Sequence, residues 1–224
     1  MKAVVFDLFE TLVTEWQKPK YLQSEVAADL GVDLQLFLGE WQSLGKQRFL
    51  GDYPNVEQVI EKILNNLGVS RDKQLIIKVA RKRELIKKQC FDVIESKIVE
   101  MLSGLKKKGY KIGLISNCSP EEIYGLEDCA LRSYMDVVVL SCDVGMIKPD
   151  VKIYEHCAFL LGEQTKNCFF IGDGGSDELN GAKKAGMTPF RALWFIKHFV
   201  ENLDSDNSYK GFYEPKDFFE YLTN

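Results

Sequence analysis

Five polar residues follow short apolar runs of the sequence and carry groups that suit chemistry on an anionic substrate. Asp7, the pair Ser116-Asn117 and Asp173 stand at the ends of three such runs, and Lys148 lies in the loop DVGMIKPD after a fourth. In open α/β sheets, ligands bind beyond the carboxyl ends of the strands. Carboxylates, a hydroxyl and an ammonium gathered at such an edge suit a site that holds a divalent cation together with an anionic group.

The elements that must position these residues alternate between apolar runs and stretches of helical spacing. This alternation predicts an α/β fold, a Rossmann-like parallel sheet with helices on both faces. The predicted strands span 2–6, 111–115, 137–140, 168–171 and, more weakly, 189–193. The predicted helices between the later strands span 98–108, 119–129, 151–162 and 176–186. Residues 204–211 are expected to form a loop before a short terminal helix.

The first half of the chain breaks this alternation. Residues 13–95 show no convincing strand, but they show amphipathic helical spacing over 56–67 and 75–90. A connection of roughly 80 residues far exceeds a normal crossover between parallel strands. We therefore predict a helical cap domain at 14–95, inserted into an α/β core domain formed by 1–13 and 96–224.

Charge and cysteine content exclude several classes of partner. The chain has 29 Lys and Arg against 33 Asp and Glu and a pI of about 5.4, whereas nucleic-acid binding favours a basic surface. No apolar run approaches the ~20 residues of a membrane span. The six cysteines form no CxxC pair and are expected to be reduced. We expect a cytoplasmic protein with a small-molecule substrate and neither nucleic acid nor membrane as partner.

Four segments together resemble a known family. FDLFETL, LISNCS, the dipeptide Lys148-Pro149 and FIGDGGSDELNGAKKAG resemble the four ordered motifs of the haloacid dehalogenase (HAD) superfamily, and the helical insertion resembles its small cap. The resemblance runs over essentially the whole chain. It does not specify the reaction, because the superfamily contains phosphatases, phosphomutases, phosphonatases and metal-free dehalogenases.

The resemblance implies a role for each residue that would touch the substrate. Asp7 would be the nucleophile and become covalently modified, as carboxylates do in aspartyl-phosphate chemistry. Ser116 and the backbone N–H of Asn117 would bind a phosphate oxygen. Lys148 would neutralise charge on Asp7 and on the phosphoryl group, and Thr11 would orient the loop around Asp7.

The resemblance also implies a magnesium site. Asp7, the backbone carbonyl of Phe9 and Asp173 would be ligands of Mg²⁺, which prefers oxygen donors. A second acid is ambiguous in register. Asp177 has the usual spacing from Asp173 and is slightly favoured, whereas Glu178 has the usual spacing to the glycines that follow.

Phe9 departs from the phosphatase pattern. Phosphatases of the family carry at this position a second Asp, which protonates the leaving oxygen and then activates water. General acid–base catalysis contributes roughly 10²–10⁴-fold, so alkyl phosphates should react slowly here. Glu10 is adjacent but is expected to point elsewhere, because neighbouring side chains diverge in extended backbone.

Three functions stay open at this point. The favoured one is a Mg²⁺-dependent phosphatase that acts on a small phosphorylated metabolite through an aspartyl-phosphate. A metal-independent 2-haloacid dehalogenase is the first alternative: it also fits Phe9 and gives Arg48 a place as halide or carboxylate anchor, although lone cap arginines are usually solvated. Asp173 argues against a dehalogenase, because dehalogenases of the family lack an acid at that position. The second alternative is a metal- or ligand-binding protein with little activity.

Two further features are given structural interpretations. The basic run 78–88 is expected to be a solvated helix face. Cys118 is expected to be a small residue that fills a turn.

Overall fold

The computed structural model describes residues 2–16, 18–196 and 208–224. Within these residues, six parallel strands form one sheet in the order β3-β2-β1-β4-β5-β6. The strands are β1 (Ala3–Phe6), β2 (Lys111–Ser116), β3 (Val137–Leu140), β4 (Cys168–Gly172), β5 (Thr188–Ala192) and β6 (Gly211–Phe212). The Rossmann-like α/β class is confirmed, and the five predicted strands match to within one residue at each end.

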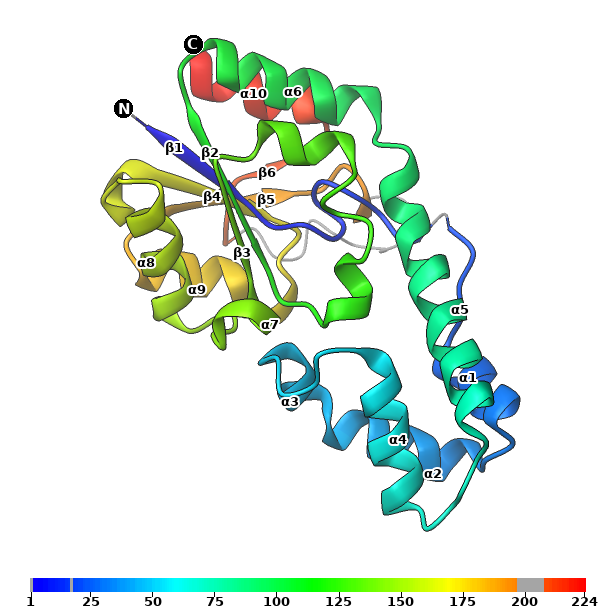
Figure 1. The fold of residues 1–224 in the computed structure, drawn as a ribbon. Coiled ribbons are helices and arrows are strands. Elements are labelled where there is room, and N and C mark those ends of the chain that lie inside the picture. Colours follow the sequence, from blue (N-terminus) through cyan, green and yellow to red (C-terminus); the bar gives the residue numbers. More distant parts are fainter. Residues whose placement is uncertain (1, 17, 197–207) are drawn as a thin grey trace.

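The order of the strands reverses at β1, in the middle of the sheet (Figure 1). The chain first builds β2 and β3 on one side of β1 and then β4, β5 and β6 on the other. Phe6, the last residue of β1, pairs with Leu114 of β2 and with Ile171 of β4. The carboxyl ends of three neighbouring strands therefore meet at the point where α/β sheets of this kind bind ligands.

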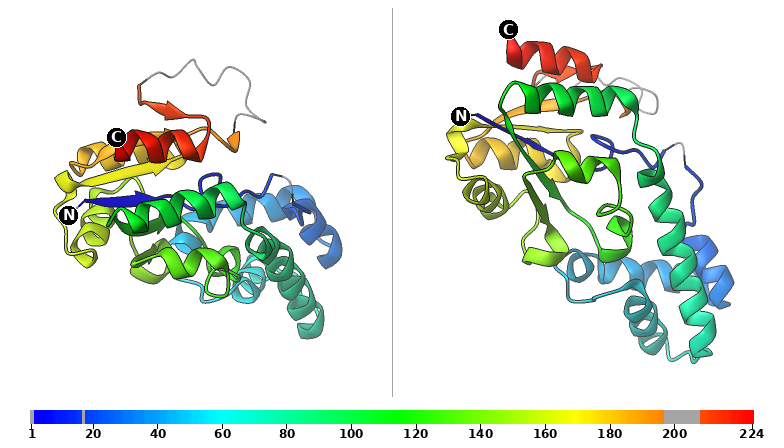
Figure 2. Two further views of the ribbon diagram at one scale, coloured as in Figure 1. Left: turned by 90° about the horizontal axis from the view of Figure 1, so that it is seen from above. Right: turned by 45° about the horizontal axis from the view of Figure 1, so that its top comes forward.

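Helices cover both faces of the sheet (Figure 2). Val4 and Phe6 of β1 belong to the apolar cluster that includes α6 and α10, whereas Ala3 and Val5 belong to the cluster that includes α8 and α9. All four side chains are fully buried, because successive residues of a strand face opposite sides and both sides are covered. These helices are α6 (Ser96–Lys107), α8 (Val151–Leu160), α9 (Glu178–Lys184) and α10 (Pro215–Thr223).

The long insertion after β1 is helical, and α5 runs from its far end back to the sheet (Figure 1). Its side chains form a separate apolar cluster within residues 21–86. The helix α4 shows how the sequence pattern acts: Asn55 accepts a hydrogen bond from the N–H of Gln58 at 3.0 Å, and the apolar residues recur along one buried face. The helices are α1 (Gln23–Leu30), α2 (Leu34–Ser43), α3 (Gly45–Phe49), α4 (Val56–Asn66) and α5 (Lys73–Asp92). The division of the chain into two domains stays a prediction.

Two predicted elements differ from the structure. The stretch 119–129 is not an α-helix: it contains the short 3₁₀ helix η1 (Pro120–Ile123) followed by turns. Gly125 lies in these turns, where an added Cβ would press on Lys88 and Phe91 of α5, so the segment follows α5 closely instead of forming its own helix. The last residue of the predicted loop 204–211 belongs to β6, a strand of two residues that is too short to show an alternating pattern in the sequence. The first four residues of this loop lie outside the described part of the chain.

Five short elements complete the described chain. They are η2 (Ala130–Tyr134), α7 (Ser141–Val144), η3 (Thr165–Asn167), η4 (Gly175–Asp177) and η1 above. No helix in the described ranges combines the length and the apolar character that crossing a membrane requires.

Candidate active site

Three carboxylates and one ammonium meet at the carboxyl edge of the sheet. Asp7 follows β1, Asp173 follows β4 and Glu178 begins α9, and each offers an oxygen within 4.8 Å of the others. Lys148 reaches this group from the loop after α7 and donates hydrogen bonds from Nζ to Asp7 Oδ1 and Glu178 Oε2. Asp7, Lys148 and Glu178 are buried and Asp173 is half-buried, so the structure brings together groups that are far apart in sequence.

The glycine-rich turn after β4 allows this close approach. A Cβ at Gly172 would collide with the carboxylate of Glu178 and crowd Cβ of Asp7, so any larger residue would push Glu178 out of its place. The turn also orients the acids, because Gly174 N donates to Glu178 Oε1 at 3.1 Å and Gly175 N donates to Asp173 Oδ1 at 2.9 Å.

Glu178, and not Asp177, lies in the acidic cluster. Asp177 is exposed, and its carboxylate accepts a hydrogen bond from Asn180 on the outside of α9. The reason is local: Asp177 has a positive φ of 54° in the turn before α9, whereas Glu178 is the first residue with helical backbone and faces the sheet. The geometry reverses the preference for Asp177 that the spacing from Asp173 gave.

The electrostatics of the cluster are unbalanced. Burial and the charge of Asp7 raise the pKa of Asp173 and that of Glu178. Burial alone would lower the pKa of Lys148, but the charges of Asp7 and Glu178 outweigh it and hold this pKa above its ordinary value. Three ionised carboxylates and one ammonium leave two negative charges in a buried place, which a divalent cation would neutralise. The oxygen donors fit Mg²⁺ in kind.

The loop after β2 is fixed to the lysine. The side-chain amide of Asn117 donates to the backbone carbonyl of Lys148 at 2.9 Å and accepts from its N–H at 2.8 Å. Ser116 is buried, and its hydroxyl has no partner among the described residues. A buried hydroxyl without a partner is costly unless a ligand satisfies it, so Ser116 fits a phosphate-binding role.

The loop around Asp7 is held by Thr11. Its hydroxyl donates to Asp7 Oδ2 at 3.1 Å, and its carbonyl accepts from the indole N–H of Trp194 at 2.8 Å. Tyr154, packed edge-on against Phe170, donates from its hydroxyl to the carbonyl of Glu178 at 2.8 Å. The role of Trp194 carried no signal in the sequence, because it lies 183 positions from its partner.

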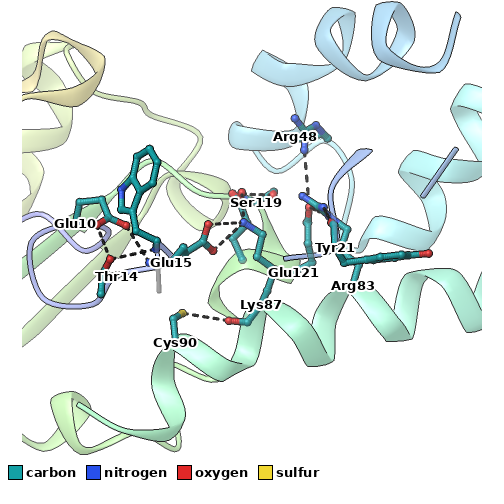
Figure 3. A network of polar contacts seen from close by, with 12 residues as sticks. Glu10, Thr14, Glu15, Tyr21, Arg48, Arg83, Lys87, Cys90, Ser119 and Glu121 are labelled. Atoms are coloured by element: carbon teal, nitrogen blue, oxygen red, sulfur yellow. Dashed lines mark hydrogen bonds and ion pairs between the residues drawn. The ribbon is translucent and has the colours of Figure 1, made fainter. Parts of the chain in front are cut away.

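Phe9 and Glu10 supply no acid aimed at Asp7. The ring of Phe9 packs edge-on against Phe91, with centroids 6.4 Å apart. The carboxylate of Glu10 accepts from the hydroxyl of Thr14 at 2.6 Å and from the N–H of Glu15 at 2.9 Å, so it closes its own loop (Figure 3). Burial, partly offset by these hydrogen bonds, raises the pKa of Glu10 to about 7.

A cavity of about 350 Å³ opens beside Phe9 and Glu10. Its other walls come from the start of the insertion, including Trp16 and Tyr21, and from α5. The cavity therefore adjoins the loop that carries the nucleophile position, and both aromatic and charged side chains line it.

A second buried group of charges joins the helices α3 and α5 of the insertion to η1 (Figure 3). Glu121 Oε1 lies 3.4 Å from Arg83 Nε and 3.8 Å from Arg48 Nη1, and all three side chains are buried. Both guanidinium groups also lie over the ring of Trp41, at 4.1 Å for Arg48 and 4.8 Å for Arg83. Arg48 is therefore not a solvated surface residue.

The expectation of a solvated face over 78–88 was wrong for Arg83. Arg83 continues the buried face of α5 that Ile76, Val79 and Ala80 begin, at helical spacing. This spacing is the signal in the sequence that could have placed it inside. Neighbouring Lys87 is mostly buried too and pairs with Glu15 at 2.8 Å.

Glu122 completes this second group. It lies 3.5 Å from Lys87 Nζ and accepts hydrogen bonds from the N–H and the hydroxyl of Ser119, each at 3.0 Å. We call the whole set the η1 ion cluster. Its members are Arg48, Arg83, Lys87, Glu15, Glu121 and Glu122.

Comparison with known families gives one match that covers most of the chain. The model of the family described as haloacid dehalogenase-like hydrolase matches residues 4–192. A phosphoglycolate phosphatase of Aquifex aeolicus is 25% identical over 195 residues, which are 87% of this chain and 85% of the relative. An N-acylneuraminate-9-phosphatase of Rattus norvegicus is 30% identical over 104 residues, or 46% of this chain, and the match spans only 41% of that relative.

Solved structures share the fold. A 2-haloacid dehalogenase from Pseudomonas syringae superposes with a TM-score of 0.72 at 20% identity, covering 100% of this chain and 98% of that one. A HAD family enzyme from Bacteroides thetaiotaomicron, in complex with magnesium and inorganic phosphate, has a TM-score of 0.64 at 18% identity, covering 86% of this chain and 94% of its own. At these identities the likeness extends to the fold alone.

Proposed function

The chain belongs to the haloacid dehalogenase-like hydrolases, and from this premise we propose that it is a Mg²⁺-dependent phosphatase of a small phosphorylated metabolite. The observation that carries the proposal is the unbalanced cluster of Asp7, Asp173 and Glu178, where three carboxylates face one ammonium. Displacement of halide by Asp7 needs no metal and therefore no such excess of negative charge. The phosphatases among the relatives support the same choice.

The residues divide into metal ligands and residues that hold them. Asp7, Asp173 and the carbonyl of Phe9 would bind the cation, which would supply positive charge to the phosphoryl oxygens. Glu178 uses one oxygen for Gly174 and the other for Lys148, so its main work is to hold the lysine beside Asp7.

The reaction would proceed in two displacements at phosphorus. A carboxylate oxygen of Asp7 forms a bond to phosphorus while the bond from phosphorus to the ester oxygen breaks. Water then attacks the phosphorus of the aspartyl-phosphate, which releases inorganic phosphate and restores Asp7. Ser116 and Lys148 would bind the non-bridging oxygens, and Thr11 holds the second oxygen of Asp7.

The leaving group would have to depart without a proton from the loop. Phe9 has no acidic group, and Glu10 is engaged by Thr14 and Glu15. Aryl and acyl phosphates leave readily as anions, whereas alkoxides do not. The cavity beside Phe9, with Trp16 and Tyr21 in its walls, would receive such a leaving group.

A panel of aryl, acyl and alkyl phosphates, together with 2-haloacids, tests the proposal when each is assayed with Mg²⁺ and with chelator. We expect Mg²⁺-dependent release of phosphate that rises steeply with the acidity of the leaving group. Release of halide in the presence of chelator would identify a dehalogenase instead, the candidate that the aromatic residue at position 9 favours. Activity on neither class would leave a binding protein.

A further inference from the structure

Two thiols meet beside the loop that carries Ser116 and Asn117. Sγ of Cys118 and Sγ of Cys142 lie 4.0 Å apart, in hydrogen-bonding contact. All six cysteines lie in the described part of the chain, and within it no other two thiols make such a contact. Cys118 is fully buried, whereas Cys142 is half-buried.

The sheet itself sets this proximity. Ser116 pairs with Leu140 where β2 and β3 end, and Cys118 and Cys142 each follow two residues later, in the loop after β2 and in α7. Ser141 ties the two segments together, because its hydroxyl accepts from Cys118 N at 3.0 Å and donates to Cys118 O at 3.2 Å.

Movement of either cysteine would reach the candidate active site. Cys118 directly follows Asn117, whose amide holds the backbone of Lys148 on both sides. Cys142 lies in α7, next to α3 of the insertion (Figure 1), and Gly51 just after α3 lies so close that a Cβ on it would collide with the carbonyl of Cys142. A disulfide requires a sulfur–sulfur distance of about 2.0 Å instead of 4.0 Å, so its formation would pull on the segments that make these contacts.

We propose that Cys118 and Cys142 form an oxidisable dithiol whose disulfide lowers the hydrolase activity. With a peroxide as oxidant, Cys142 Sγ attacks one oxygen, the O–O bond breaks, and a sulfenic acid and water form. The sulfur of Cys118 then attacks Cys142 Sγ, the S–O bond breaks and a second water leaves. Two thiols and one hydrogen peroxide thus give one disulfide and two waters, and a dithiol reductant restores the thiols.

The order of these steps follows from the surroundings. The contact with Cys142 and burial both raise the pKa of Cys118, which disfavours its thiolate. Cys142 is the more accessible of the two and meets the oxidant first. The effect on turnover rests on the proposed phosphatase function, whereas the formation of the disulfide does not.

The test oxidises the intact protein with hydrogen peroxide, blocks the remaining thiols and maps the peptides by mass. We expect a linked peptide pair that contains Cys118 and Cys142 and is about 2 Da lighter than the two thiols. We also expect Mg²⁺-dependent aryl phosphate turnover to fall by about 10- to 100-fold, because a displacement of ~1 Å at a catalytic group can cost that much. A dithiol reductant should restore it.

Two variants separate this dithiol from general oxidation. Cys142→Ser should keep its basal turnover and lose its sensitivity to peroxide, while Cys129→Ser, at another half-buried cysteine, should behave as the parent does. Absence of the linked peptides, or equal peroxide inhibition of Cys142→Ser and parent, would overturn the proposal, as would a disulfide that leaves turnover unchanged. A reduced protein without phosphatase activity would overturn the proposed function instead. The peptide masses would then still show whether Cys118 and Cys142 form a disulfide.

Discussion

Two buried groups of charges differ in their balance. The candidate active site holds three carboxylates and one ammonium, whereas the η1 ion cluster holds three carboxylates, two guanidinium groups and one ammonium. With every group ionised, the second group is neutral, whereas the first carries two negative charges. Most members of both groups are buried, where water screens charge poorly, so the imbalance of the first is costly without a ligand.

Position explains why the two groups diverge. The acidic group stands on the ends of β1 and β4, where short turns hold each carboxylate, and its excess charge suits a cation that arrives from outside. The η1 ion cluster joins segments far apart in sequence through pairs that satisfy one another. We infer that the first group serves chemistry and the second serves the attachment of the insertion to the core.

The largest effect should come from Asp7→Asn. The variant removes the nucleophile but keeps its shape, and we expect turnover to fall by roughly 10⁴-fold or more. Its unfolding temperature in chelator should not fall much, because one source of repulsion in the acidic group is lost. Asp177→Asn, at an exposed acid outside the group, is the control and should keep turnover. An unchanged kcat in Asp7→Asn would rule out covalent catalysis by Asp7.

The matching change in the η1 ion cluster is Glu121→Gln. It leaves Arg83 and Arg48 buried without their shared carboxylate, which should lower the free energy of unfolding by about 3 kcal/mol. Urea unfolding measures this. Glu127→Gln, in the exposed pair with Arg132, should cost less than about 1 kcal/mol. Equal effects of the two changes would show that the buried cluster does not stabilise the fold.

The sequence predicted the strand-end group far better than the η1 ion cluster. Asp7 and Asp173 each follow an apolar run, so local pattern and motif order were enough to place them on one edge. Arg83 and Glu121 lie 38 positions apart on elements whose contact depends on how the insertion folds back. Arg83 carried a helical signal for burial, but nothing local identified Glu121 as its partner.

The sequence did not predict the direction of individual side chains, even inside a motif. Whether Asp177 or Glu178 faces Asp7 depends on the positive φ of Asp177, which turns one side chain outward and the next inward. The segment 119–129 had helical spacing, yet contact with α5 leaves it as a 3₁₀ turn. Both outcomes depend on tertiary contacts that periodicity does not contain.

Binding of Mg²⁺ sharpens the contrast between the two groups. Addition of Mg²⁺ at about 100 times its Kd should stabilise the parent by about 2.7 kcal/mol, because the ion would bind the folded chain alone. Asp173→Asn should lose most of this gain, and Asp177→Asn should retain it. The shift in unfolding temperature between chelator and Mg²⁺ is the measurement. Equal shifts in the parent and Asp173→Asn would contradict a metal site at Asp173.

Phe9→Asp increases the imbalance of the acidic group and restores a leaving-group acid. We expect turnover of alkyl phosphates to rise by about 10²-fold and that of aryl phosphates to change little. Phe9→Leu, which also loses the contact with Phe91, is the control and should leave the ratio of the two rates unchanged. Position 9 is half-buried, and an unpaired polar group there costs about 1–3 kcal/mol when neutral and more when ionised, so unfolding temperatures are measured alongside. A folded Phe9→Asp without a gain on alkyl phosphates would contradict the phosphatase proposal.

The smallest effect concerns Glu10, which interacts with both groups. Its carboxylate accepts a hydrogen bond from the N–H of Glu15 in the η1 ion cluster, and the negative charge of Asp173 contributes to its raised pKa. Burial raises the pKa of Glu10 from 4.5 to about 7, so the folded chain holds this proton more tightly than the unfolded chain. The stability linked to Glu10 is therefore fully present below pH 4.5 and is lost as pH rises toward 7. Glu10→Gln removes this dependence, so the parent should lose more unfolding free energy than the variant between pH 5 and pH 7.5. Because Glu10 is only half-buried, solvent screening should keep the difference to about 1 kcal/mol or less. Urea unfolding in chelator at both pH values measures it, and parallel pH profiles of parent and variant would show that Glu10 titrates as it does in the unfolded chain.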